Sequence, residues 1–202
     1  MRHAIVAALA GLAPAVLAAP ALGQALEFVW DGTIPLPGET ITIGLRASFS
    51  PDDYAMAGIA TRILSGEGTD GLSGLRLVAP MDGPGTSAGM FSGGNIDGII
   101  AGQLNFPTAG IFADPSNPIA FWEVDYTAPV VVTRPVLVDF QTETSRFDVY
   151  VDRDRATSES RLGDLEEASL LIAIPAPAGA TVLLGGLAMA STRRRAAGAA
   201  RP

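Results

Sequence analysis

The chain has 202 residues and contains no cysteine and no lysine, so disulfide and thiolate chemistry are excluded. All 21 acidic residues fall between Glu27 and Glu167, where eight arginines leave a net charge of −13. This charge excludes nucleic acid as a partner, because binding to a phosphate backbone depends on dense Lys and Arg. It is compatible with high solubility, with divalent cations and with neutral glycans.

The first residues predict export. Met1 to His3 carry positive charge, residues 4–17 are apolar, and residues 19–25 are small. This order is typical of a signal peptide, and the apolar run is shorter than the roughly 20 residues that a membrane-spanning helix needs. Cleavage after Gly23 or after Ala25 fits the small-residue rule, and we assign residues 1–23 to the signal peptide.

Residues 24–173 predict an all-β domain, an antiparallel β-sandwich. Apolar and polar residues alternate over 40–49, 122–127 and 147–152, as they do in half-buried antiparallel strands. Turn-forming Pro, Gly, Asn and Asp separate the runs, which favours two packed sheets. Further strands are predicted at 26–30, 59–65, 72–78, 96–104, 130–132, 136–141 and 168–174. Short helices are alternatives at 55–64 and 159–170, and the Gly-rich stretch 66–98 predicts many loops.

Two short motifs match enzymes by their letters alone. Residues 85–89 read Gly-Thr-Ser-Ala-Gly, but a serine nucleophile needs a histidine, and the chain's one histidine, His3, lies in the signal peptide. Residues 66–71 match the letters of a dinucleotide-binding fingerprint. The helix that such a fingerprint requires is not predicted after them, and Glu67 and Asp70 would repel phosphate. We interpret both as Gly-rich sequence without catalytic function.

Carboxylates are the remaining side chains that could act in catalysis. Glu123 and Asp125 share one face of a predicted strand beside Trp122, and two carboxylates at a suitable separation hydrolyse glycosides. Trp122 and Tyr126 are candidates for stacking against sugar rings. The same alternation also predicts the opposite arrangement, with the acids in solvent and the aromatic rings in the core. We expect that the protein is not an enzyme.

Asp152 and Asp154 are candidate Ca²⁺ ligands at the end of a predicted strand, because calcium prefers oxygen ligands. Arg153 and Arg155 alternate with them, which favours a neutralised, solvated charge run. No other cofactor is expected.

The C-terminal segment 174–202 predicts a sorting function. Pro175 and Pro177 precede an uncharged run, from which we predict a transmembrane helix at 178–192, and Arg193, Arg194 and Arg195 follow. Proline keeps the peptide extended and therefore open to a protease. This order resembles the PEP-CTERM class of bacterial sorting signals in its Val-Pro-x-Pro-Ala variants, with Ala176 in place of the name-giving glutamate.

The resemblance implies processing by an exosortase near Pro175–Pro177, after signal peptidase has acted at the other end. It also implies a Gram-negative host that makes exopolysaccharide. The protein would be anchored transiently in the inner membrane through its tail and would then be secreted or displayed on the cell surface.

A second resemblance concerns the middle domain. Gly38-Glu39-Thr40-Ile41-Thr42-Ile43, followed by Ala57-Gly58-Ile59, resembles the opening strands of cohesin-type jelly rolls. We therefore expect an exported, non-catalytic surface or matrix protein associated with exopolysaccharide. The alternatives are a carbohydrate-binding module with an exposed aromatic face and a carboxylate-dependent glycoside hydrolase.

Overall fold

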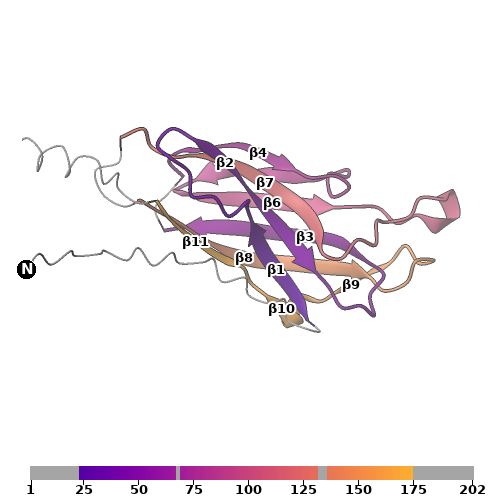
Figure 1. The fold of residues 1–202 in the computed structure, drawn as a ribbon. Helices are drawn as coiled ribbons and strands as arrows, with labels where there is room; N and C mark the ends of the chain where they lie inside the picture. The colour runs from indigo at the N-terminus through magenta and orange to yellow at the C-terminus, as the bar shows by residue number, and fades with distance from the viewer. Residues whose placement is uncertain (1–22, 67–68, 132–135, 175–202) are drawn as a thin grey trace, which may run out of the picture.

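The computed structural model describes residues 23–66, 69–131 and 136–174 (Figure 1). The signal peptide up to residue 22 and the sorting segment from Pro175 onward, which includes Pro177 and Arg193 to Arg195, lie outside the described residues. Within the described ranges, no helix is long and apolar enough to cross a membrane.

Two β-sheets pack face to face, and the predicted antiparallel β-sandwich is confirmed. The first sheet has the order β10-β1-β2-β7-β4, and the second has the order β11-β8-β3-β6-β5. All neighbouring strands run antiparallel except β1 and β10, which are parallel. The first sheet consists of β10 (Leu165–Glu166), β1 (Gln24–Val29), β2 (Thr40–Ser48), β7 (Ile119–Thr127) and β4 (Leu72–Leu77). The second consists of β11 (Ser169–Ile174), β8 (Val136–Tyr150), β3 (Ala55–Ser65), β6 (Asn95–Gly102) and β5 (Ser87–Ser92).

Three short elements complete the described fold. Strand β9 (Ser158–Ser160) extends the second sheet by pairing with the end of β8. Two single-turn 3-10 helices, η1 (Pro107–Ala109) and η2 (Leu162–Asp164), lie in the connections.

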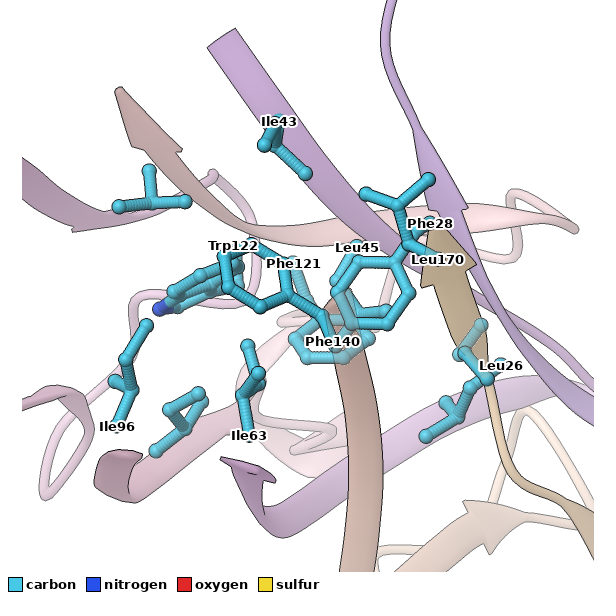
Figure 2. Close-up of a cluster of buried hydrophobic side chains, with 14 of the residues drawn as sticks. Leu26, Phe28, Ile43, Leu45, Ile63, Ile96, Phe121, Trp122, Phe140 and Leu170 are labelled. Atoms are coloured by element: carbon cyan, nitrogen blue, oxygen red, sulfur yellow. The ribbon is translucent and has the colours of Figure 1, made fainter. Parts of the chain in front are cut away.

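The core fills the space between the sheets. Along β2 the inward residues Ile41, Ile43 and Leu45 are buried, and Thr40 and Thr42 on the other face are exposed, as the alternation predicts. Figure 2 shows how side chains from both sheets meet in one apolar cluster, among them Phe28, Leu45, Phe121, Trp122, Phe140 and Leu170. With no disulfide available, this packing is the main source of stability.

The predicted strand at 59–65 is confirmed as part of β3, and the alternative helix at 55–64 is wrong. This segment lies between β6 and β8 in the middle of a sheet, where an almost continuous apolar sequence is buried. The alternative helix at 159–170 is also wrong, because these residues contain β9, η2, β10 and the start of β11. Residues 87–89, in the stretch predicted to hold many loops, belong to strand β5. Val130 and Val131 of the predicted strand 130–132 are exposed outside any strand.

Candidate functional site

The aromatic residues proposed as a sugar platform lie inside the sandwich. Trp122 is 0% exposed and Tyr126 is 4% exposed, so neither ring is available to stack against a glycan (Figure 2). A β-bulge between β2 and β7 is the reason that both Phe121 and Trp122 are buried, although they are neighbours in sequence. The indole nitrogen of Trp122 donates a hydrogen bond to the carbonyl oxygen of Ala88, at 2.9 Å. A carbohydrate-binding module that stacks sugars on Trp122 would need this ring exposed, and the ring is buried.

Glu123 and Asp125 do lie on the outer face of the first sheet, as a catalytic pair would require, but both are engaged by one arginine. Arg76 donates from Nε to Glu123 at 2.8 Å and from Nη1 to Asp125 at 3.0 Å. Arg76 and the hydroxyl of Thr42 hold the pKa of Asp125 below its usual value. A general acid needs the opposite shift, so this arrangement stabilises the sheet and does not suit acid catalysis at Asp125.

Asp152 and Asp154 lie in the turn between β8 and β9. Asp152 accepts a hydrogen bond from the backbone N–H of Asp154 and forms an ion pair with Arg155 at 3.7 Å. Across the described ranges, no three His, Cys, Asp or Glu side chains come together in a group that could hold a metal ion.

A different site emerges on the outer face of the second sheet. A shallow depression with a volume of about 450 Å³ is formed by residues of β3, β6 and β8. Bulges in the pairing of β3 with both neighbours lie at this place, at Ala60/Thr61 toward β8 and at Thr61/Ile63 toward β6. Bulges often lie next to binding sites, because they change the direction in which side chains point. The lining residues are Ala60, Thr61, Arg62, Asp97, Gly98, Ile99, Ile100, Glu143, Thr144 and Ser145.

An ion pair forms one side of this depression. Arg62 donates to Oε2 of Glu143 from Nε at 3.1 Å and from Nη2 at 2.6 Å. Both side chains remain about half exposed, and the pKa of Arg62 is raised, mainly by its hydrogen bond to Glu143. Arg62 therefore offers hydrogen-bond donors to solvent and Glu143 offers an acceptor, and each side chain is held by the other.

Asp97 contributes the most unusual group of the site. Its Oδ1 atom is buried and has no hydrogen-bond partner among the described residues. A buried acceptor without a donor costs about 1–3 kcal/mol, so such an atom indicates a place where a ligand or water supplies the missing donor.

Hydroxyl groups complete the lining, and the structure behind them is well ordered. The hydroxyls of Thr61 and Thr144 lie 3.1 Å apart, and that of Ser145 donates to the carbonyl of Ala60. Glu167 accepts hydrogen bonds from both the backbone N–H and the hydroxyl of Thr144, at 2.8 and 2.9 Å. The depression thus has a rigid polar lining, to which Ile100 adds an exposed apolar surface.

No protein-family model and no curated protein matches the chain. Similar solved structures are cohesin modules. The seventh ScaB type I cohesin of Pseudobacteroides cellulosolvens has a TM-score of 0.48 at 9% identity, over 78% of this chain and 96% of that one. The Coh-OlpA-Doc918 complex of Clostridium thermocellum, a type I cohesin–dockerin complex, gives a TM-score of 0.45 at 13% identity, over 72% and 96%. The type III cohesin of the ScaE cell-surface anchoring scaffoldin of Ruminococcus flavefaciens gives 0.34 at 10% identity, over 74% and 87%. These likenesses concern the sandwich alone and assign no partner or activity to this chain.

Proposed function

We propose that this chain is an exported surface or extracellular matrix protein that acts by binding exopolysaccharide, not by catalysis. In this proposal the depression on the outer face of the second sheet is the glycan contact, in place of the aromatic platform that the sequence suggested. The observation that supports it best is the depression itself, around which the Arg62–Glu143 ion pair, the Asp97 carboxylate and hydroxyl groups lie together.

The chemistry of the lining suits sugars. A sugar ring offers hydroxyl groups that both donate and accept hydrogen bonds, and C–H surfaces that pack on apolar side chains. Asp97 and Glu143 supply acceptors, Arg62 supplies donors, and Ile100 supplies an exposed apolar contact. The strongly acidic composition of residues 27–167 favours a neutral glycan over an anionic one.

Binding can be measured by isothermal titration of the protein, isolated from its host, with exopolysaccharide from the same host. We expect Arg62→Ala combined with Glu143→Ala to weaken binding at least tenfold, and Asp97→Ala to have a similar effect. The matched control is Arg46→Ala combined with Glu27→Ala, which removes an equivalent Arg–Glu pair, 2.7 Å long, from the first sheet. Equal effects of the two double variants, or no binding by the unaltered protein, would exclude the depression as the glycan site.

Sorting by an exosortase is the second part of the proposal. It is supported by the order of Pro175, Pro177, the apolar run at 178–192 and Arg193 to Arg195 in the sequence. Intact-mass measurement of the protein from the host envelope and medium should show loss of the arginine cluster. Deletion of the host's exosortase should restore it. Recovery of the intact chain, arginines included, from the cytosol would contradict this part and leave the glycan test unaffected.

A further inference from the structure

The connection between β6 and β7 projects from one end of the sandwich (Figure 1). It carries several exposed apolar side chains. Leu104, Phe106, Ile111 and Phe112 are each 41–50% exposed, and we call these four residues the apolar tip. The backbones of Phe106 and Ile111 pair through hydrogen bonds of 2.8 and 3.1 Å, which close the connection around η1. Residues 103–113 carry no charge at all.

In this connection polar side chains are buried and apolar side chains are exposed. Gln103 and Asn105 are buried, at 8% and 1% exposure, and hold the loop from within. The Gln103 side chain donates to Met56 O at 2.8 Å and accepts from the backbone N–H of Asp114 at 2.7 Å. The hydrophobic effect alone would bury the phenylalanines and expose the amides. The connection therefore holds an apolar surface in a fixed conformation, which lowers the entropic cost of binding a partner.

The turn between β8 and β9 lies against the tip and adds no net charge to it. Asn105 donates from Nδ2 to the carbonyl oxygens of Arg153 and Arg155, at 2.9 and 2.8 Å. The guanidinium of Arg153 lies 4.2 Å from the centre of the Phe112 ring. Asp152 and Asp154 alternate with the two arginines, so the turn has no net charge.

The zero net charge of residues 103–113 and 152–155 matters because the domain as a whole is strongly acidic. Two copies of such a domain repel each other over most of their surface. At the tip they can approach, and in a twofold contact Arg153 and Arg155 of one copy face Asp152 and Asp154 of the other. This combination of exposed apolar groups and self-complementary charge fits a second copy of the same chain.

The tip also lies far from Ile174, the last described residue of β11. Ile174 pairs with Val136 at the start of β8, and the tip is bound to the residues just after Tyr150 at the other end of that strand. At about 3.3 Å per residue, β8 separates these two places by about 45 Å. A contact between two tips would leave Ile174 of each copy at the two far ends of the pair.

We propose that two copies of the chain dock tip to tip through Leu104, Phe106, Ile111 and Phe112 and through the turn Asp152–Arg155. Each copy contributes far fewer residues than the roughly 20–30 of a standard interface, so we expect a weak, concentration-dependent dimer.

Sedimentation velocity of the protein isolated from its host, over a range of concentrations, tests this proposal. Phe106→Ser combined with Ile111→Ser should weaken the dimer at least tenfold without unfolding the domain, since both side chains are exposed. Met90→Ser combined with Leu171→Ser removes two other exposed apolar side chains and should leave the dimer unchanged.

The charges are tested separately by exchange. Arg153→Glu with Arg155→Glu, and Asp152→Arg with Asp154→Arg, should each weaken self-association, and an equimolar mixture of the two variants should dimerise again. A monomer at all concentrations would overturn the proposal. So would association that survives loss of the tip residues, or tip-dependent binding to phosphatidylethanolamine–phosphatidylglycerol vesicles by a monomeric protein.

Discussion

Trp122 in β7 and Ala88 in β5 connect the two sheets of the sandwich by a hydrogen bond, because the indole nitrogen of the first donates to the carbonyl oxygen of the second at 2.9 Å. β7 belongs to the first sheet, and β5 is an edge strand of the second. A large apolar ring thus fills the core and at the same time satisfies its one polar atom.

Substitution at Trp122 should therefore change stability. We expect Trp122→Ala to lower the free energy of unfolding by about 3–5 kcal/mol, because it leaves a large cavity. Trp122→Phe should cost about 1–3 kcal/mol through a smaller cavity and the lost hydrogen bond. The matched control is Trp30→Phe, because the indole nitrogen of Trp30 is buried without a partner in the described structure. Urea unfolding measures all three variants, and an equal cost at Trp30 and Trp122 would show that the bond to Ala88 contributes nothing.

The pair of Arg76 and Asp125 should make stability depend on pH. The pKa of Asp125 is lower in the folded state than in an unfolded chain, so its contribution is present above about pH 4 and is lost as the pH falls through the folded value. Asp125→Asn should cost about 1 kcal/mol or less at pH 7, since both partners are partly exposed, and progressively less as the pH falls below about 4. Thermal unfolding between pH 2 and 7 gives the difference, and a constant difference over this range would contradict it.

Asp53 and Arg161 form the most deeply buried ion pair that the described residues contain. Asp53 is 3% exposed and lies 3.0 Å from the Arg161 guanidinium. Arg161→Ala should cost about 2 kcal/mol because it leaves a buried carboxylate without its cation. Arg62→Ala removes an exposed pair and should change the free energy of unfolding much less than Arg161→Ala. Adding Asp53→Asn to Arg161→Ala should recover part of the loss, and strict additivity of the two changes would exclude coupling between them.

The first strand distinguishes the two predicted cleavage positions. Gln24 and Ala25 are both buried, and they pair with Leu165 of β10 and Ser48 of β2. Cleavage after Ala25 would remove both residues from the sheet, so we expect the mature protein to begin at Gln24. N-terminal sequencing of the exported protein checks this, and a start at Leu26 would show that β1 forms without its first two residues.

Alternation predicted the half-buried strands because each presents one face to the core. Thr40–Phe49 is the clearest case, since the buried Ile41, Ile43 and Leu45 follow its period of two. At β3 the pattern left a strand at 59–65 and a helix at 55–64 both open, because a central position buries nearly every residue and removes the alternation. It also gave no indication of β5, whose Gly89 has a positive φ and lies under the backbone and side chains of β6.

The candidate site could not be predicted from local sequence patterns. Arg62, Asp97 and Glu143 lie on three different strands, and only the sheet order and two bulges place them around one depression. The acidic pair that the sequence did single out, Glu123 and Asp125, was correctly placed on an outer face. Its shared partner Arg76 could not be predicted, because β4 lies 46 residues or more away in sequence from both acids.

Strand β11 ends at Ile174, which is 1% exposed and paired with Val136. Pro175, the first proline of the motif, follows this buried residue directly in the sequence. In the sorting that we propose, an enzyme that cuts the motif must therefore act next to the wall of the sandwich or first separate strand β11 from β8. The free-energy cost of separating that one strand would then limit the rate of cleavage.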